Sequence, residues 1–314
     1  MATMDFAGRV AIVTGSGRGM GRSHAMMLAS RGARVVVNDL RSEAGDPASD
    51  VVREIEAAGG QAVVSHRSVV SEAPQLIADA IAAFGRIDVL VCNAGIMSSE
   101  RLDEATAADW QNVFDVHFQG TVETCRAAWP YLAQSGSGRI VVTSSSGMLG
   151  NEGLTSYGGA KAAIYGFGRS LAFEGERHGI NVNVIMPTAW TRMSTTIEDA
   201  AITGVIEAHF QPYHVSALVT WLAHQDTKVN NEAFQVSGGR AGRIMMAALP
   251  TVRVPESTPE MWANAAPQLL ADGEPTPMRT TADLFGSELA AADPAIQEVV
   301  GGESGIGYNR ASGR

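Results

Sequence analysis

Short runs of β-branched residues alternate with longer stretches of helical periodicity over the first two-thirds of the chain. The runs at Val35–Val37 and Ile140–Val142 are apolar without alternation, a pattern typical of parallel strands that helices cover on both faces. The sequence therefore predicts strands over Arg9–Thr14, Arg34–Asn38, Gln61–Ser65, Val89–Asn93, Arg139–Ser144, Asn181–Met186 and Glu232–Ser237. It predicts helices over Met20–Ser30, Ala48–Ala58, Ala73–Phe84, Trp110–Gln134, Tyr157–Arg177 and Thr203–Phe210.

The alternation of strands and helices requires crossover connections, which build parallel sheets. We therefore predict an α/β fold over residues 1–245, a doubly wound, Rossmann-like parallel sheet of about seven strands with helices on both faces. Residues 246–314 differ in character, because prolines recur between Pro250 and Pro277 and β-branched and aromatic residues are few. This segment is expected to be a C-terminal extension of loops and short helices, not an independent domain.

Composition narrows the class of protein. Apolar residues make up 45% of the 314 residues and charged residues 18%, which excludes a disordered chain or a coiled coil. The net charge of -10 argues against a nucleic-acid partner and, less strongly, against an anionic membrane surface. Cys92 and Cys125 lie in apolar runs and are expected to be buried free thiols, and no Cys and His spacing suggests a metal site. Without a leader-like N-terminus or a long apolar run, a cytoplasmic location is expected.

A glycine-rich turn, TGSGRGMG at Thr14–Gly21, joins the first predicted strand to the first predicted helix. Backbone N–H groups in such a turn can approach a pyrophosphate, and the helix N-terminus adds partial positive charge. The spacing is T-G-x-x-x-G-x-G and not G-x-G-x-x-G, so its place at the first strand–helix junction carries the prediction of a dinucleotide site.

Asp39 follows the second predicted strand, where an acid accepts hydrogen bonds from the adenosine ribose of a dinucleotide. Its negative charge repels a 2′-phosphate, which favours NAD over NADP. Arg18 and Arg41 oppose this preference because either can pair with a phosphate, so NADP stays an alternative.

A second constellation points to proton transfer. Tyr157 and Lys161 stand four residues apart in a predicted helix and therefore share one face. A phenol with a pKa of about 10 is a poor base at neutral pH, and a nearby cation lowers that pKa. Ser144 ends a predicted strand at the edge of the sheet where ligands bind, so its hydroxyl can donate to a substrate oxygen.

With these motifs and Asn93-Ala94-Gly95 after the fourth strand, residues 6–245 resemble the common single-domain type of the short-chain dehydrogenase/reductase (SDR) family. The resemblance implies an NAD(P)-dependent oxidoreductase that interconverts a secondary alcohol and a ketone. Tyr157 would be the general acid/base, Lys161 would hold the nicotinamide ribose and lower the pKa of Tyr157, and Ser144 would orient the substrate oxygen. The implied cofactor-binding residues are Gly15, Arg18, Gly19, Met20, Gly21, Asp39, Leu40, Ser68, Val69, Asn93, Ala94, Gly95, Tyr157, Lys161, Pro187, Ala189, Thr191 and Met193.

Three positions depart from the family pattern. His117 stands where the family usually has an Asn that helps a water relay protons to the lysine, and an imidazole can relay or serve structure only. Ser68 replaces an Asp that grips the adenine, which leaves that contact to the Val69 backbone. Pro187-Thr188 replaces the usual Pro-Gly.

A narrower resemblance concerns the substrate. His117, Val35–Asp39 and Arg192-Met193 are similar to hydroxyacyl-CoA dehydrogenase domains of multifunctional β-oxidation enzymes and to hydroxysteroid dehydrogenases. Residues 188–214 are expected to form an apolar, aromatic lid that suits a bulky or lipophilic alcohol. Candidate substrate residues are Met148, Trp190, Phe210 and His214, with Tyr213 in the lid and Arg192, Arg240 and Arg243 as candidates for a CoA thioester. Aryl and terpene alcohols stay open.

Two other classes of protein share parts of this pattern. A non-catalytic NAD-binding sensor would have the same fold, and a sugar-nucleotide epimerase or dehydratase shares the Tyr–Lys pair but usually has a T-G-x-x-G-x-x-G loop and a C-terminal substrate domain. Trp110–Gln134 and Tyr157–Arg177 correspond to the usual dimer faces of the SDR family, so a homodimer or homotetramer is expected. The extension from Pro250 is expected to touch the active-site rim or a subunit interface.

Overall fold

The computed structural model describes residues 3–43, 45–192, 194 and 199–292. The chain divides into two compact units, residues 1–243 and 244–314, and each is described by itself.

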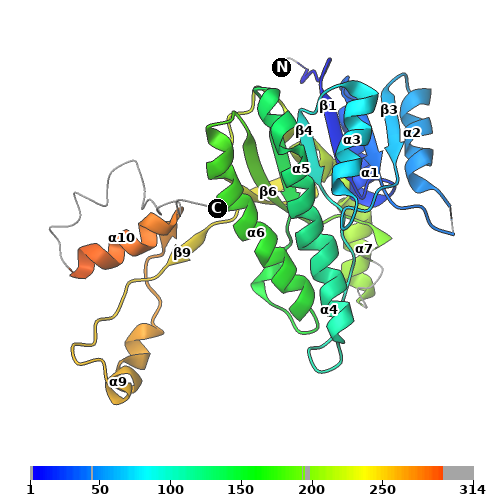
Figure 1. Cartoon of the computed structure of the whole chain (residues 1–314). Coiled ribbons are helices and arrows are strands. Elements are labelled where there is room, and N and C mark those ends of the chain that lie inside the picture. The colour runs from blue at the N-terminus through cyan, green and yellow to red at the C-terminus, as the bar shows by residue number, and fades with distance from the viewer. Residues whose placement is uncertain (1–2, 44, 193, 195–198, 293–314) are drawn as a thin grey trace. The chain divides into compact units, whose positions relative to one another are not determined.

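The first unit is built on one sheet of eight strands in the order β3-β2-β1-β4-β5-β6-β7-β8 (Figure 1). The first seven pair in parallel: β1 (Val10–Thr14), β2 (Arg34–Asn38), β3 (Gln61–Ser65), β4 (Val89–Cys92), β5 (Arg139–Thr143), β6 (Asn181–Pro187) and β7 (Ala233–Ser237). This order, with strands added outward on both sides of β1, confirms the predicted doubly wound, Rossmann-like fold.

The strand count differs from the prediction of about seven. An eighth strand, β8 (Arg240–Arg243), pairs antiparallel with β7 across the turn at Gly238-Gly239. Its sequence, RAGR, has no β-branched or aromatic residue and all four residues are exposed, so no hydrophobic pattern marks it. Pairing with β7 defines this strand, and pairing is not a local property.

Eight helices lie in the described part of this unit: α1 (Gly19–Ser30), α2 (Pro47–Ala57), α3 (Ala73–Phe84), α4 (Ala107–Phe114), α5 (Gly120–Gln134), α6 (Thr155–Glu176), α7 (Ala200–His209) and α8 (Pro212–Ala223). The predicted helix over Trp110–Gln134 is helical throughout and ends at Gln134, but it begins earlier, at Ala107, and contains a π-helical turn at Asp115–Gln119 between α4 and α5. Helix α8 was not predicted, since its apolar residues form a near-continuous run without clear periodicity.

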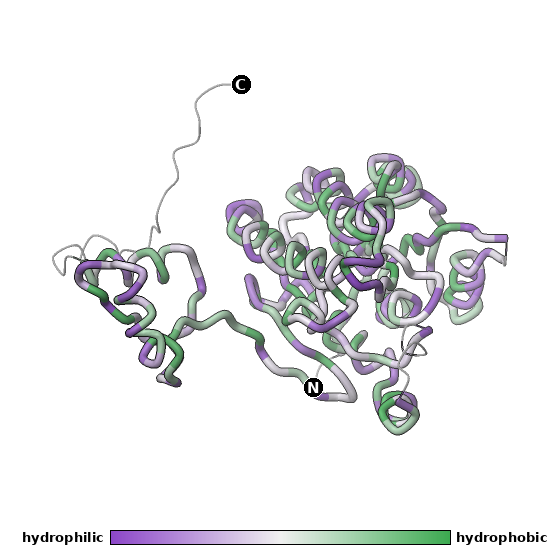
Figure 2. Tube along the Cα trace, turned by 90° about the horizontal axis from the view of Figure 1, so that it is seen from below, coloured by the Kyte–Doolittle hydropathy of each residue, from purple (hydrophilic) through white to green (hydrophobic). Residues whose placement is uncertain are grey.

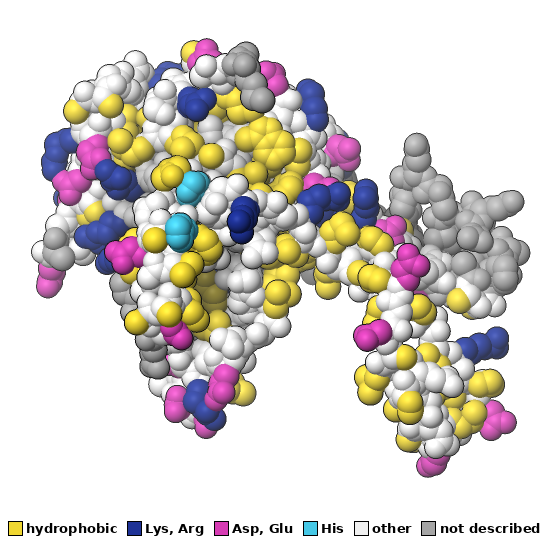
Figure 3. Space-filling model, turned by 180° about the vertical axis from the view of Figure 1, so that it is seen from behind, with side chains coloured by type: hydrophobic (Ala, Val, Ile, Leu, Met, Phe, Trp, Pro, Cys, Tyr) yellow, Lys and Arg dark blue, Asp and Glu magenta, His cyan; other side chains and the backbone are white. Residues whose placement is uncertain are grey.

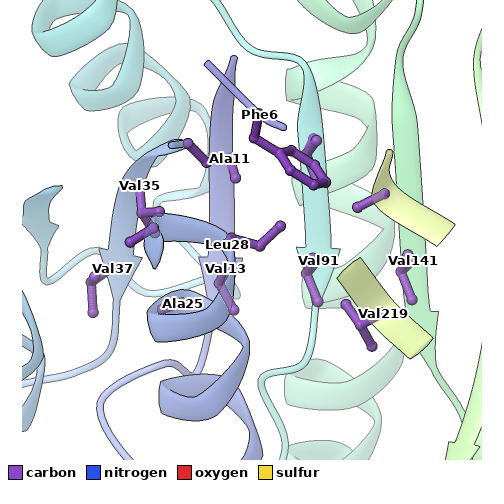
Figure 4. Packing of buried hydrophobic residues seen from close by; sticks show 14 of the residues in the cluster. Phe6, Ala11, Val13, Ala25, Leu28, Val35, Val37, Val91, Val141 and Val219 are labelled. Carbon is purple, nitrogen blue, oxygen red and sulfur yellow. The ribbon is translucent and has the colours of Figure 1, made fainter. Parts of the chain in front are cut away.

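The core on one face of the sheet is built from alternate strand residues. Val13, Val37 and Val91 belong to one buried cluster with Leu28 of α1 and Val219 of α8 (Figure 4). Helices α3, α5 and α6 lie in front of the sheet in Figure 1 and cover the other face. Along these helices, hydrophobic and hydrophilic residues alternate in Figure 2, as expected when one side of each helix is buried.

The order of the strands predicts a binding crevice at the carboxyl ends of β1 and β4. Strands β1 and β4 are neighbours, but the connections that follow them lead to opposite sides of the sheet. Ligands of doubly wound sheets bind beyond the carboxyl ends of the strands at such a switch point. The predicted site residues Gly15, Asn93 and Ser144 all follow these carboxyl ends.

The second unit contains a small antiparallel pair, β9 (Met246–Ala248) with β10 (Thr276–Met278), and the helices α9 (Pro259–Leu269) and α10 (Thr281–Ala292). The pair of strands was not expected. None of its large apolar side chains that the structure describes is buried. Over the described ranges of the whole chain, no helix is both long and apolar enough to cross a membrane.

Candidate active site

The glycine-rich turn between β1 and α1 forms a tight cradle. Gly15 and Gly19 have φ values of +62° and +54°, a conformation that favours glycine. A Cβ on Gly21 would collide with the Gly15 carbonyl and with the Asn93 amide, so only glycine fits there. Among the described residues no side chain caps α1, and its first N–H groups are available to an anion.

The loop after β4 is clamped to the end of β1. Asn93 Nδ2 donates to the Thr14 carbonyl at 3.0 Å and to the Gly15 carbonyl at 3.1 Å. The Thr14 hydroxyl accepts from the backbone N–H groups of Asn93 at 3.0 Å and of Ala94 at 3.1 Å. Asn93 therefore holds the loop after β4 against the glycine-rich turn. Thr14, whose hydroxyl makes the second pair of contacts, is a site residue that sequence reasoning missed.

These two loops line a cavity of about 450 Å³ together with the ends of β2 and β3. Its walls include every predicted residue of the adenosine and phosphate end: Gly15, Arg18, Gly19, Met20, Gly21, Asp39, Leu40, Ser68, Val69, Asn93, Ala94 and Gly95. Thr191 and Arg192 line it as well. The predicted contributors from four strand ends thus converge on one cavity.

The carboxylate of Asp39 is held in place at this cavity. Its Oδ2 accepts from the Gly17 N–H and its Oδ1 from the Leu40 N–H, both at 2.9 Å. Arg41, which was expected to favour a 2′-phosphate, pairs instead with Asp46 at 3.0 Å. Arg18 remains on the cavity wall, and Arg67 joins it there but pairs with Glu72 and Asp79.

A second cavity of about 400 Å³ shares Met20, Asn93, Gly95 and Thr191 with the first, so the two form one elongated site. Its walls include the four predicted catalytic residues Ser144, Tyr157, Lys161 and His117, and the predicted cofactor residues Pro187 and Ala189. Met193 lies outside the described residues. A reactive end therefore adjoins the glycine-rich cradle.

Tyr157 and Lys161 lie one turn apart on α6, as predicted, but their electrostatics differ from the expectation. Lys161 Nζ lies 5.6 Å from the centre of the Tyr157 ring and donates to the Thr143 carbonyl at 2.7 Å. Burial lowers the pKa of Lys161 to about 7. Burial raises the pKa of Tyr157 above its ordinary value, and a hydrogen bond with the Ser145 side chain acts in the opposite direction. The expected lowering by Lys161 is absent because desolvation of the phenolate dominates.

Two neighbouring hydroxyls differ in their partners. Ser144 is buried, and its Oγ donates to the Lys161 carbonyl at 2.7 Å. Ser145 also lines the reactive cavity; its Oγ accepts from the Gly147 N–H at 3.1 Å, and its side chain interacts with the Tyr157 phenol. Sequence reasoning missed Ser145, because nothing local distinguishes it from Ser144 in the run of three serines at Ser144–Ser146.

His117 projects from the π-helical turn between α4 and α5. Its Nε2 lies 2.6 Å from the Ile96 carbonyl and 3.1 Å from the Ile96 N–H, and its ring meets Tyr157 edge to face at 5.3 Å. The buried Nδ1 has no hydrogen-bond partner among the described residues. Burial lowers the pKa of His117 to about 3, with the charge of Lys161 acting in the same direction. The imidazole is therefore neutral over the physiological range.

The chain matches a known protein family over most of its first unit. Residues 9–201 match the family model described as short chain dehydrogenase. The chain belongs to the short-chain dehydrogenase family. Members of this family are oxidoreductases that use a nicotinamide cofactor.

Three similar proteins illustrate the range of this family. The peroxisomal multifunctional enzyme type 2 of Drosophila melanogaster is 40% identical over 250 residues, which are 77% of this chain and 41% of that relative. This dehydrogenase therefore spans about two fifths of that relative. A crystal structure of a short chain dehydrogenase from Mycobacterium avium has a TM-score of 0.77 at 35% identity and covers 88% of this chain and 98% of its own. A 7α-hydroxysteroid dehydrogenase, solved with NADH and 7-oxo glycochenodeoxycholic acid, has a TM-score of 0.70 at 29% identity over 76% of this chain and 96% of its own.

Most of the candidate substrate residues of this dehydrogenase do not line the two cavities. Trp190 donates its backbone N–H to the Phe210 carbonyl at 2.7 Å, and the ring of His214 packs on Tyr213 with centroids 4.1 Å apart. Neither Trp190, Phe210 nor His214 is among the described residues that line the two cavities. Met148 Sδ lies 3.8 Å from Ser144 Oγ, next to the reactive cavity. The structure therefore brings one of the four candidates close to the reactive end.

Proposed function

We propose that this short-chain dehydrogenase interconverts a secondary alcohol and a ketone with NAD, and that Tyr157, Ser144 and Lys161 carry the proton chemistry. The observation that carries the proposal is the elongated site, in which a glycine-rich cradle at one end adjoins a buried phenol, ammonium and hydroxyl at the other.

The residues fit a nicotinamide dinucleotide. A Cβ on Gly15 or Gly21 would collide with neighbouring atoms, and no described side chain caps the N-terminus of α1 beside the cavity, so this end of the helix offers N–H groups to a pyrophosphate. When bound, the nicotinamide would supply the acceptor or donor of a hydride. Thr191 packs against Gly19 and is proposed to bind the nicotinamide carboxamide, beside Pro187 and Ala189.

The proton chemistry is assigned to three side chains. Tyr157 takes the hydroxyl proton of the alcohol during oxidation and returns it to the carbonyl oxygen during reduction. Ser144 orients the substrate oxygen once its hydroxyl turns from the Lys161 carbonyl. Lys161 holds the nicotinamide ribose and exchanges protons with Tyr157. Burial favours the neutral phenol, which suits proton donation to a ketone.

We assign His117 to a proton relay toward Lys161, through a neutral imidazole. Its unpartnered, buried Nδ1 and its electrostatic proximity to Lys161 support this role. The two contacts of Nε2 with Ile96 give the same side chain a structural task, since they hold the loop after β4.

We propose that Asp39 gives the site its preference for NAD over NADP. Both of its carboxylate oxygens already accept backbone N–H groups, so the charge is held at the cavity wall. The pairing of Arg41 with Asp46 removes one of the two cations that were expected to favour NADP. Arg18 keeps NADP as the alternative.

The substrate is proposed to be bulky or lipophilic, similar to a 3-hydroxyacyl-CoA or a hydroxysteroid. The hydroxysteroid dehydrogenase solved with 7-oxo glycochenodeoxycholic acid supports this kind of molecule. Aryl or terpene alcohols are the alternative. A homodimer or homotetramer and a cytoplasmic location stay predictions, and the Drosophila relative is named as a peroxisomal enzyme.

An initial-rate screen of the purified protein tests the proposal. Nicotinamide absorbance is followed with NAD and with NADP against 3-hydroxyacyl-CoA, hydroxysteroids, and aryl and terpene alcohols. Turnover of one class with NAD is expected. NAD binding without turnover of any class would favour the non-catalytic sensor, and exclusive use of NADP would contradict the role of Asp39.

A further inference from the structure

The wall of the reactive cavity changes in character from its buried end toward solvent. Ser144, Lys161 and His117, at the buried end, are no more than 4% exposed. Two further wall residues that sequence reasoning did not single out, Met97 and Leu154, have large apolar side chains. Met97 is 39% exposed and Leu154 is half-buried. A substrate whose reacting carbon lies at the buried end would therefore extend past these two apolar side chains toward solvent.

These two side chains come from two loops that meet, the loop after β4 and the loop between β5 and α6. The side chain of Arg101 in the first loop pairs with Glu152 in the second. A Cβ on Gly153 would lie 3.3 Å from the Ser99 carbonyl oxygen, so the loops also approach each other closely at their backbones. The two loops are therefore held together beside the reactive cavity.

The same loops carry further large apolar side chains. Leu102 is 65% exposed and Leu149 is 74% exposed, and Met148 lies beside the reactive end. Small-molecule sites are typically lined by apolar side chains, with a few polar groups that fix the orientation of the ligand. With Met97 and Leu154 on the cavity wall, the apolar part of a substrate would find contacts on both loops.

The charged residues of the two loops are mostly acidic. Over residues 93–106 and 144–154 the sequence has four carboxylates, Glu100, Asp103, Glu104 and Glu152, and one cation, Arg101. Arg101 pairs with two of these carboxylates, Asp103 and Glu152. The loops therefore carry net negative charge, which repels the phosphates of a CoA thioester and does not act on an uncharged molecule.

The arginines that were expected to bind a CoA thioester do not line the reactive cavity. Arg192 lines the cavity at the cofactor end, and Arg243 pairs with Glu232 at 2.8 Å. Arg240 is exposed and is not on the described wall of either cavity. Among the described residues that line the reactive cavity, Lys161 is the one lysine or arginine.

We propose that the loop after β4 and the loop between β5 and α6 form the substrate subsite, in which Met97 and Leu154 determine specificity for the apolar part of an uncharged, lipophilic secondary alcohol. This inference rests on the proposed function. It selects a hydroxysteroid-like substrate over a 3-hydroxyacyl-CoA, because the subsite combines apolar walls with acidic loops.

The first test measures how kcat/KM with NAD depends on the length of an uncharged substrate, from 2-butanol to 2-nonanol. For the wild type we expect kcat/KM to rise about two- to fourfold per methylene, the gain from burying that group against an apolar wall. In the double variant Met97→Asn/Leu154→Asn the rise should fall below about 1.5-fold per methylene, because amides replace the apolar side chains.

The chain-length dependence is a ratio within one preparation, so a smaller fraction of folded enzyme in a variant does not alter it. Phe173→Asn is the matched control, because Phe173 is half-exposed on α6 about four turns beyond Tyr157. This variant should keep the chain-length dependence of the wild type.

A pair of substrates tests the charge of the subsite. The CoA thioester and the N-acetylcysteamine thioester of one 3-hydroxyacyl group share the reacting part and differ in the phosphates. We expect the neutral thioester to have the higher kcat/KM at low salt, and only the CoA thioester to improve as added salt screens the acidic loops. A kcat/KM at least about tenfold higher for the CoA thioester would overturn the uncharged class of substrate.

The other outcomes separate the subsite from the proposed function. An equal chain-length dependence in the wild type and in the double variant would overturn the role of Met97 and Leu154. Turnover of another class of substrate with no turnover of any 2-alkanol would overturn the inference and leave the proposed function standing. Absence of both NAD binding and turnover of every class would overturn the proposed function itself.

Discussion

At the scale of single residues, we assign the proton chemistry of the site to the phenol of Tyr157. We predict that Tyr157→Phe leaves NAD affinity nearly unchanged, because the ring still packs against His117, and lowers the turnover rate by about 10²- to 10⁴-fold. Binding is measured by calorimetry and turnover by nicotinamide absorbance. Tyr131→Phe on α5 is the matched control, and a Tyr157→Phe variant that keeps more than about a tenth of the wild-type rate would refute the assignment.

The ionisation of Tyr157 also predicts a pH dependence. Burial raises the pKa of this phenol, so the site holds the protonated form through neutral pH. Oxidation of an alcohol needs the phenolate as base, and its rate is therefore expected to rise with pH, whereas reduction of a ketone needs the phenol and is expected to fall only at alkaline pH. The profiles of kcat/KM in the two directions check this, and an oxidation rate independent of pH between about 6 and 9 would contradict it.

At the scale of elements, the π-helical turn between α4 and α5 sets the position of His117. A continuous α-helix would present this side chain at another angle, and π-helical turns often occur at functional sites. The loop after β4 is matched to the ring so closely that a Cβ on Gly95 would lie 2.5 Å from His117 Cε1. Loop and turn therefore form one unit.

We predict that Gly95→Ala displaces the His117 ring, breaks its contacts with Ile96 and weakens NAD binding at least about tenfold, with a loss of about 1–3 kcal/mol of unfolding free energy from overpacking. Chemical denaturation and calorimetry measure the two effects. The same substitution in a His117→Ala background should be much less harmful, because the clashing ring is gone. Gly242→Ala, where a Cβ meets nothing within 4 Å, is the control, and equal effects of Gly95→Ala in both backgrounds would contradict the coupling.

The accuracy with which the sequence predicted element bounds also differs between elements. Strands β2 and β3 and helix α3 have the predicted bounds, because their hydrophobic pattern is local and a glycine or a turn ends them. The π-helical turn between α4 and α5 and strand β8 were not predicted, because no hydrophobic pattern marks the turn and because the strand depends on pairing with β7.

At the scale of the whole molecule, the second unit has many large apolar side chains at its surface. Hydrophobic side chains lie on the face of this unit that Figure 3 shows. The large apolar side chains exposed among its described residues are Met245, Met246, Leu249, Trp262, Leu269, Leu270, Leu284 and Phe285. A unit of this size without a buried apolar core is not expected to be stable by itself. That the extension touches the active-site rim or a subunit interface stays a prediction.

We predict that truncation after residue 248 lowers the oligomer mass, raises KM for the substrate, or does both, because exposed apolar area then loses its counterpart. Light scattering gives the mass and steady-state kinetics gives KM, with the full chain measured in parallel. Unchanged mass, KM and activity would show the extension to be surface decoration.

The sequence by itself determined the doubly wound fold and the cradle glycines and predicted Tyr157, Lys161 and Ser144 near one edge of the sheet, because periodicity, turn chemistry and spacing are local properties. His117 was singled out only through the family resemblance. Tertiary structure alone decided the raised pKa of Tyr157, the partner of Ser144 and the proximity of Ser145 to Tyr157. These depend on burial and on groups distant in sequence, since desolvation and hydrogen-bond partners arise only when separate elements pack together.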